Sequence, residues 1–546
     1  MVREGGKKNI ELANIQYVSG PDNTKVIINL TGKPEYRISS TVNPPEMRIS
    51  FTGVNLSPEV KGALAVNDGR VNEIKTSRSG KNAVFLTISM VPSLGYKASF
   101  YRNETFAIVI DIRQEKAIEE EAGIKGKAPA KEEEKEEAGR RWADLIHLGG
   151  YAKNETAYRI SSPDRFTKIR NIFFLSGTGK ISDSVSYRAS GRAVYDAVYS
   201  LTDNYPKSVR DDQKYDPGIR DFFVDVSKGD WDLRLGSQQI VWGEAVGLFF
   251  ADVVNAKDLR EFVLPDFDYI RIPDWAADIE YTKDRFHLEL VWIPILKFNK
   301  LGLPDSEFPQ ALPLPSGVSA SATGESKPSS SLHNSEAGVR LSYLLSGWDF
   351  SLFHMYAWDK FPTVVREVIT PVFYTFHPEH RRINISGLTV AKEIDDIVLR
   401  GEFVYYRGKY FSVVDPNDSD GLVKKDYLDY LLGISYTFLG KLDANVQFMQ
   451  RIIFDYDPRI FREDRVRSSV SLWLKTGFLD NTIEPELLFI SSLRERDVMI
   501  RPMMNFRYGG HWQFKAGVDI FDGVPDGAFG QFRKKNRVYG EAKYSF

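Results

Sequence analysis

The fold is decided by the last nine residues of the chain, Val538-Tyr539-Gly540-Glu541-Ala542-Lys543-Tyr544-Ser545-Phe546. Every second position is apolar or small, and the positions between them include Glu541, Lys543 and Ser545. Successive side chains of a strand point to opposite faces, so this strand has one apolar face and one wet face. That pattern is typical of the last strand of an outer-membrane β-barrel, which has lipid outside and water inside. The alternative is the last strand of a soluble sheet, and the rest of the chain must decide between them.

The same alternation recurs through the region 142–546, for example at 184–195, 442–449, 466–475 and 512–520. We count about 18 strand segments, as many as a large outer-membrane barrel has. A soluble sheet of this size would have to bury many charged side chains at high cost, whereas a water-filled lumen removes that cost. The alternation therefore predicts an antiparallel transmembrane β-barrel.

The connections between these segments alternate between short and long. Short turns are predicted at 227–230, 282–284, 345–347, 439–441 and 508–510, and longer links at 200–216, 244–274, 296–334, 360–380, 411–426 and 522–532. Short turns of such barrels face the periplasm and long loops face the exterior. An even number of strands leaves both ends of the barrel in the periplasm.

Trp348 and Trp358 offer one geometric check of the barrel. They share a parity and stand ten residues apart. At a rise of ~3.3 Å per residue and a tilt of ~40°, they lie about 25 Å apart along the membrane normal, which is the height of the lipid belt. We therefore predict that they mark the two interfaces of one strand.

Composition excludes several classes of protein. A net charge of −2 argues against a nucleic-acid binder, and the absence of cysteine excludes disulfides and thiolate chemistry. The seven histidines are scattered and no Gly-x-Ser-x-Gly motif accompanies them, so we expect no enzyme and no cofactor. No hydrophobic segment follows Met1, so, for an exported protein, we expect the sequence to begin either at a mature N-terminus or at an artificially trimmed one.

Two loop segments contain residue types that bind metals. His377-Pro378-Glu379-His380 includes a proline that prevents both imidazoles from sharing one helix face, and Asp415–Gly421 departs from the register of a calcium loop. We predict that both are surface turns and that no metal binds. The serine-rich stretch 316–331 is predicted to be a mobile loop.

The first part of the chain predicts a separate small β-rich domain. Strands are expected at 25–30, 47–51, 83–88 and 106–112, several of them apolar on both faces as in a sandwich. With 36–38, 44–51 and 69–75, these segments resemble the AMIN domain, a periplasmic β-sandwich of cell-wall amidases and pilus secretins. The resemblance covers 8–113 and implies binding to peptidoglycan or another envelope partner. A sandwich that only spaces or plugs is equally compatible. Residues 114–141, rich in Glu and Lys, are predicted to be a charged flexible linker.

A second resemblance lies inside the barrel region. The run Arg234–Glu244 includes Arg234-x-Gly236-x-Gln238 and Trp242-Gly243-Glu244, and Asn255-x-x-Asp258-Leu259-Arg260 follows within the next loop. With Arg271-Ile272-Pro273, these pieces resemble an outer-membrane barrel family known as domain of unknown function 1302. The loop 244–274 is predicted to fold inward and narrow the pore, and the alternative is an external lid. The expected constriction residues are Trp242, Glu244, Asp252, Asn255, Asp258, Arg260 and Arg271.

The wet faces of the strands predict which residues line the pore. They are Arg188, Arg192, Arg234, Gln238, Arg340, Arg400, Glu402, Arg451, Arg467, Lys475, Arg501, Arg507, Lys515 and Arg537. Facing acids are expected at Asp196, Asp232, Asp429, Asp443, Glu484, Glu486, Asp519 and Glu541. The small excess of arginine favours anions or acidic sugars, and mutually neutralising ion pairs are the alternative.

Together these observations predict an all-β protein, with an N-terminal sandwich at 8–113 and an outer-membrane barrel of about 18 strands at 142–546. We expect a porin-like channel for polar or anionic solutes, attached to the cell wall or an envelope partner through its periplasmic domain. The alternatives are a conduit for polysaccharide or lipid cargo, and a plugged barrel that tethers the outer membrane to peptidoglycan. Outer-membrane lipid is the expected surrounding, and a monomer is expected because no apolar patch stands apart from the lipid face.

Overall fold

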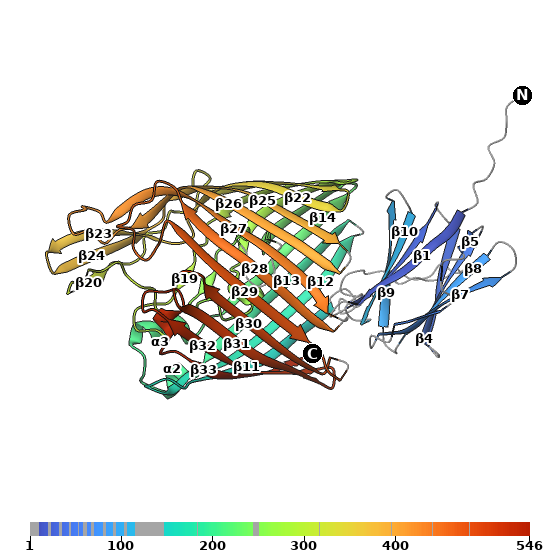
Figure 1. Cartoon of the computed structure of the whole chain (residues 1–546), viewed down its shortest axis with the longest axis horizontal. Helices are drawn as coiled ribbons and strands as arrows, with labels where there is room; N and C mark the ends of the chain where they lie inside the picture. The colour runs from blue at the N-terminus through green and yellow to red at the C-terminus, as the bar shows by residue number, and fades with distance from the viewer. Residues whose placement is uncertain are drawn as a thin grey trace, which may run out of the picture. The chain divides into compact units, whose positions relative to one another are not determined.

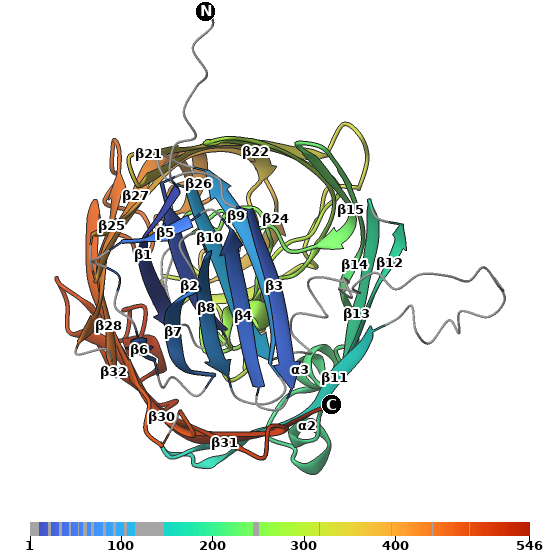
Figure 2. The same cartoon turned by 90° about the vertical axis from the view of Figure 1, so that its right-hand side faces the viewer.

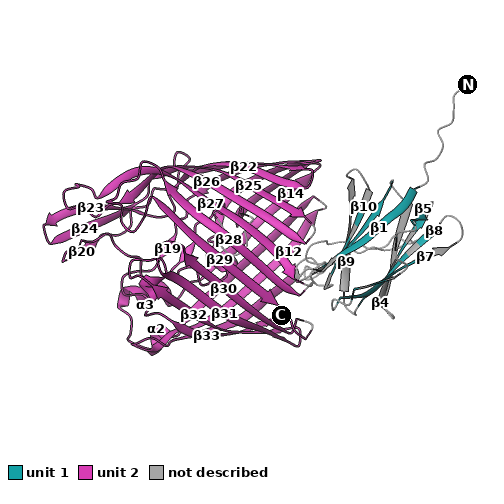
Figure 3. Cartoon of the chain, in the orientation of Figure 1, with its two compact units in different colours: residues 1–140 teal, residues 141–546 magenta. Residues whose placement is uncertain are grey.

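The computed structural model describes residues 10–114 and 147–546, with gaps at 20–22, 32–34, 43–44, 53, 58–59, 61–62, 67–69, 80–82, 91–93, 103–105, 183, 244–249, 316, 395, 439–440 and 480. The chain divides into two compact units, residues 1–140 and residues 141–546 (Figure 3). The predicted linker 114–141 lies outside the described residues except for Gln114, the last residue of a strand.

The first unit contains two five-stranded sheets. One has the order β5-β1-β2-β10-β9 and the other the order β3-β4-β8-β7-β6. The strands are β1 (Ile10–Ser19), β2 (Asn23–Leu30), β3 (Glu35–Val42), β4 (Pro45–Thr52), β5 (Val54–Leu56), β6 (Ala63–Ala65), β7 (Val71–Ser79), β8 (Ala83–Met90), β9 (Leu94–Arg102) and β10 (Phe106–Gln114). The four predicted strands are therefore confirmed, as β2, β4, β8 and β10.

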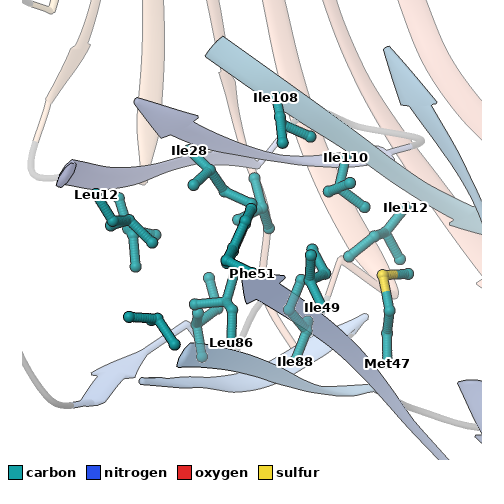
Figure 4. Close-up of a cluster of buried hydrophobic side chains, with 14 of the residues drawn as sticks. Leu12, Ile28, Met47, Ile49, Phe51, Leu86, Ile88, Ile108, Ile110 and Ile112 are labelled. Atoms are coloured by element: carbon teal, nitrogen blue, oxygen red, sulfur yellow. The ribbon is translucent and has the colours of Figure 1, made fainter. Parts of the chain in front are cut away.

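The core of this unit lies between the two sheets. Ile28 and Ile110 from one sheet and Ile49, Phe51 and Leu86 from the other are fully or almost fully buried in one cluster. Figure 4 shows these side chains converging from the strands on either side. Strands β2, β4, β8 and β10 place alternate residues in this cluster, which is how two packed sheets share a core. The predicted β-sandwich is confirmed.

The second unit is a closed barrel of 18 antiparallel strands, as predicted (Figures 1 and 2). The strands are β11 (His147–Arg159), β12 (Arg165–Ser182), β13 (Val185–Asp196), β14 (Gly218–Lys228), β15 (Trp231–Gln238), β17 (Asp274–Lys283), β18 (Phe286–Ile295), β21 (Glu336–Leu345), β22 (Trp348–Trp358), β25 (Arg382–Ile394), β26 (Ile397–Ser412), β27 (Leu422–Phe438), β28 (Leu442–Ile453), β29 (Val466–Thr476), β30 (Ile483–Ser492), β31 (Asp497–Tyr508), β32 (Trp512–Gly523) and β33 (Arg537–Ser545). Strand β33 pairs with β32 on one side and with β11 on the other, which closes the ring.

The C-terminal strand has the two faces that its sequence predicts. Val538 is 42% exposed on the outer face, whereas its neighbour Arg537 is 4% exposed. Strand β22 begins at Trp348 and ends at Trp358, so the two tryptophans do stand at opposite ends of one strand. None of the helices in the described parts of the chain is long and apolar enough to span a membrane. Closure of the ring gives the backbone polar groups of the strands partners within the sheet, as a lipid environment requires.

The short and long connections lie at opposite ends of the barrel, and the long links carry further structure. These elements are α2 (Val198–Leu201), α3 (Lys207–Gln213), β16 (Asp258–Leu259), α4 (Phe267–Ile270), β19 (Lys300–Leu301), β20 (Ser319–Ala322), β23 (Thr363–Thr370), β24 (Phe373–Glu379) and the 3-10 helix η2 (Gly530–Phe532). Strands β20, β24 and β23 form a separate three-stranded sheet, visible beyond one end of the barrel wall in Figure 1.

This additional sheet corrects two predictions. The serine-rich stretch 316–331 contains β20, which pairs with β24, so it is not simply a mobile loop. The His377–His380 segment is not a surface turn, because His377 lies on β24 and the side chain of His380 is fully buried. The imidazole of His380 stacks on Phe298 and contacts Glu325 at 2.7 Å, which explains its burial. By contrast, Asp415–Gly421 does form a turn, where Arg459 contacts Asp415 at 3.0 Å.

Candidate functional site: a loop that crosses the barrel interior

The link after β15 runs through the inside of the barrel. At one end, the backbone N–H groups of Phe250 and Ala251 donate to the carboxylate of Glu402, on β26, at 2.7 and 2.9 Å. Further along, Glu261 contacts Arg170, on β12. Counting along the ring, β26 is nine strands from β12, which is half of the 18. A segment that touches both strands with buried groups must cross the lumen.

The start of this link is anchored by Trp242. Its indole ring is fully buried against Phe353 on β22, and its Nε1 donates to the carboxylate of Glu289 on β18 at 2.8 Å. The ring lies over Gly338 of β21, where an added Cβ would come within 2.6 Å of it. Glycine at 338 therefore makes the room that the tryptophan occupies. Glu244, which was predicted beside it, lies outside the described residues.

Asn255 and Asp252 hold the middle of the link. The Asn255 side chain accepts from the N–H of Ile240 at 2.7 Å and donates to Asp274 at 2.9 Å. The carboxylate of Asp252 is fully buried and pairs with Arg271 at 3.0 Å. The predicted residues Trp242, Asp252, Asn255 and Arg271 therefore fasten the loop.

Glu261 fastens the loop to the opposite wall. Its carboxylate contacts Lys168 and Arg170 on β12, and Arg537 on β33 at 3.5 Å. Burial tends to raise the pKa of Glu261, but the three positive charges outweigh burial and hold that pKa well below its usual value. Glu261 is therefore charged at neutral pH, and its ion pairs attach the loop to the wall.

An apolar contact reinforces this attachment. Leu264 is buried together with Phe308, Phe521, Phe529 and Phe532, which come from wall strand β32 and other long links, in one hydrophobic cluster. The same cluster includes lumen-facing apolar residues of the wall, namely Leu431, Met449, Ile490 and Met499. Apolar side chains are unusual on the inner face of a water-filled barrel, and here they pack against the inserted loop and two other long links.

Between the loop and the wall lies a cavity of about 430 Å³. Eight cationic and eight acidic side chains line it, so its charge is balanced. The wall strands supply seven of the cations but only three of the acids. The remaining acids come from the links, and these are Asp216, Asp258, Glu261, Asp266 and Asp268. A positive wall therefore faces a negative loop, and this complementarity stabilises the insertion.

Ion pairs hold the predicted lumen cations. Eight predicted residues line the cavity, namely Arg192, Asp258, Arg260, Glu486, Arg501, Lys515, Arg537 and Glu541. Eleven of the twelve predicted lumen cations lie within 4 Å of a carboxylate, and Arg400 donates to the Ser435 hydroxyl at 2.9 Å. The alternative of mutually neutralising pairs thus describes the wall better than a free cationic surface does.

Several predicted residues lie away from this cavity. They are Arg188, Arg234, Gln238, Arg340, Arg400, Arg451, Arg467, Lys475 and Arg507, which lie elsewhere on the wall strands, and Glu402, which anchors the loop. Typical pairs are Arg234 with Asp225 at 2.6 Å and Arg451 with Asp429 at 2.8 Å. Gln238 is buried and donates to the carbonyl of Ala276 at 3.2 Å. These contacts join neighbouring strands of the wall.

The sequence prediction missed the residues whose ion pairs hold the loop against β11 and β12. Glu261 directly follows the predicted Arg260, and Lys153, Glu155, Lys168 and Arg170 lie on β11 and β12. A signal was present in the spacing of two between Lys153 and Glu155 and between Lys168 and Arg170, which places each pair on one face of its strand. Among the described residues, no group of three or more His, Asp or Glu side chains is arranged to hold a metal ion.

Comparison with known proteins agrees with this architecture. The family model described as "Protein of unknown function (DUF1302)" matches residues 175–546, more than half of the chain. The chain belongs to this family. An AMIN domain model matches residues 14–115, so the sandwich is the AMIN domain of the chain. The family barrel therefore lies in the outer membrane and the AMIN domain lies in the periplasm.

Solved outer-membrane proteins are similar to this family member only in a general way. A structure of Salmonella typhi OmpF in complex with daunomycin matches with 8% identity over 73% of this chain and 97% of that chain, at a TM-score of 0.37. Acinetobacter baumannii OccAB1 matches with 9% identity over 73% and 96%, at 0.45. The outer membrane channel DcaP of A. baumannii matches with 11% identity over 73% and 97%, at 0.37. These values are too low to carry an argument about function. A search of the curated proteins finds no match.

Proposed function

We propose that the barrel is a passive channel for small polar solutes, organic anions among them. The observation that carries the proposal is the charged cavity of about 430 Å³ between the inserted loop and the barrel wall. A lumen lined by ionic groups lowers the cost of removing water from a polar solute, and an apolar interior would not. The narrowest part of the passage is formed by the loop 250–273, whose residues reach both sides of the ring.

The positive wall supports a modest preference for anions. Seven of the cations that line the cavity project from wall strands, whereas most of the acids belong to links that pack onto that wall. Any outward movement of the links would leave the wall cations facing the solute. The preference is modest because the described cavity holds equal numbers of both charges.

Single-channel recording in a planar bilayer tests the proposal. We expect the purified full-length protein to give steady open channels, with a reversal potential in a KCl gradient displaced toward chloride. A folded protein that stays electrically silent would contradict the channel.

One observation favours a second candidate, a plugged barrel that tethers the outer membrane to peptidoglycan. The loop is attached at both sides of the ring, and two apolar clusters join its residues to the wall. In that case the AMIN domain would provide the wall contact. Co-sedimentation of the full-length protein with purified peptidoglycan, compared with protein lacking residues 1–140, tests this contact. Equal sedimentation of both would contradict the tether.

A further inference from the structure

A second glutamate occupies a basic cluster inside the barrel, at the end that carries the long links. Glu307, in the link between β18 and β21, has a side chain that is only 8% exposed. Arg159 of β11 donates to both of its carboxylate oxygens, at 3.2 and 3.3 Å. The Tyr205 hydroxyl donates to the same carboxylate at 3.1 Å. Buried polar side chains of the barrel and its links therefore already bind one carboxylate at this position.

Two more cations approach Glu307 from further away. Arg165 lies at 3.6 Å and Lys535 at 3.8 Å, and their side chains are 20% and 22% exposed. The Arg165 guanidinium also lies over the ring of Tyr205, 4.6 Å from its centre. Both side chains are thus partly exposed to solvent.

The charges of this cluster do not balance. Arg159, Arg165 and Lys535 carry three positive charges, and within the described residues Glu307 is the one carboxylate within 4 Å of any of them. The Arg165 Nε is buried and has no hydrogen-bond partner among the described groups. Burial lowers the pKa of Lys535, and the two arginines lower it further against the opposing effect of Glu307. Two partly buried positive charges are left over, and holding them without an anion is costly.

We propose that Arg159, Arg165 and Lys535 form a binding site for the carboxylate of a small organic acid, which Glu307 occupies when no solute is present. The site would capture anionic solutes on the loop side of the lumen before they reach the Glu261 contact. The inference rests on the proposed channel for its physiological meaning, but binding can be measured without transport. A carboxylate is the expected ligand group because the guanidinium and hydroxyl donors already hold one in this geometry.

Equilibrium dialysis of radiolabelled succinate against the full-length protein in detergent micelles, at low ionic strength, tests the site. We expect Lys535→Gln to weaken succinate binding about ten-fold, the effect of losing one charge-assisted hydrogen bond. Lys534→Gln is the matched control, because Lys534 is the exposed neighbour and carries the same charge. Glu307→Gln is expected to tighten binding about ten-fold, since it removes the competing carboxylate.

Two results would overturn the inference. Equal weakening by Lys535→Gln and Lys534→Gln would mean that net charge alone attracts succinate. Unchanged or weaker binding in Glu307→Gln would mean that Glu307 does not compete for the site. A protein that binds succinate with the expected pattern but conducts no ions would overturn the channel and leave the binding site standing. A conducting channel whose variants all bind succinate equally well would overturn the binding site and leave the channel standing.

Discussion

Replacement of Glu261 by glutamine tests whether the loop is held in place by its ion pairs. The wild-type carboxylate is buried and contacts Lys168, Arg170 and Arg537. Removing one member of a buried ionic cluster costs about 3–5 kcal/mol, because the remaining charges lose their compensation. Glu155 still lies 3.3 Å from Lys168, so the lower end of that range applies. At about 1.4 kcal/mol per factor of ten, the ratio of attached to released loop should fall by roughly 100-fold.

Amide hydrogen exchange read by mass spectrometry measures this ratio directly. In Glu261→Gln, peptides that cover residues 250–266 should exchange roughly 100-fold faster than in the wild type, if exchange proceeds through release of the loop. Peptides from the wall strands should not change, since their ladder hydrogen bonds are untouched. Single-channel conductance should rise in the same variant because the released loop no longer narrows the lumen.

Asp268→Asn provides the matched control. Asp268 lies in the same loop and loses the same charge, but its side chain is 91% exposed. Equal exchange rates in the two variants would refute the reasoning, since the buried ion pairs would then contribute nothing to the position of the loop. The contribution of Glu261 should also be constant between about pH 5 and pH 8. Its folded pKa is lowered, so the stabilisation is present above the unfolded value of about 4.3 and is lost only in stronger acid.

Three further predictions concern other parts of the barrel. Leu352→Arg, on the exposed outer face of β22, should destabilise the barrel by about 2–4 kcal/mol in lipid vesicles unfolded with urea, and an unchanged midpoint would contradict a lipid-facing position. Gly338→Ala should displace the Trp242 ring and destabilise the barrel by about 1–3 kcal/mol in the same assay. An unchanged stability would mean that the ring can shift without cost. Asp216 pairs with Arg260 at 2.7 Å and with Lys300 at 2.9 Å. Burial tends to raise the pKa of Asp216, but these positive charges outweigh burial and lower that pKa to about 2. The stability lost in Asp216→Asn should therefore be constant down to about pH 4 and should vanish toward pH 2, and a difference that persists at pH 2 would contradict this pairing.

The sequence predicted the barrel well because its lipid face and its wet face alternate along every strand. The last strand shows this most clearly, since the apolar parity that includes Val538 is the outer face and Arg537 points inward. The strand number and the positions of the short turns followed from the same pattern. Prediction was poorer in the long links, where β20 and β24 pair across more than fifty residues. Such pairing leaves no local periodicity to read.

What the sequence by itself determined is the wall, because a two-residue period acts locally and lipid selects one parity. It also indicated that the link after Trp242 was unusual. Only the tertiary structure decided what that link contacts: Glu402 on one side of the ring, and Arg170 and Arg537 on the other. Which carboxylate meets which cation depends on how a closed ring brings distant strands around one lumen. Glu261 and Glu307 are ordinary loop residues until the fold places each of them against basic residues of the wall.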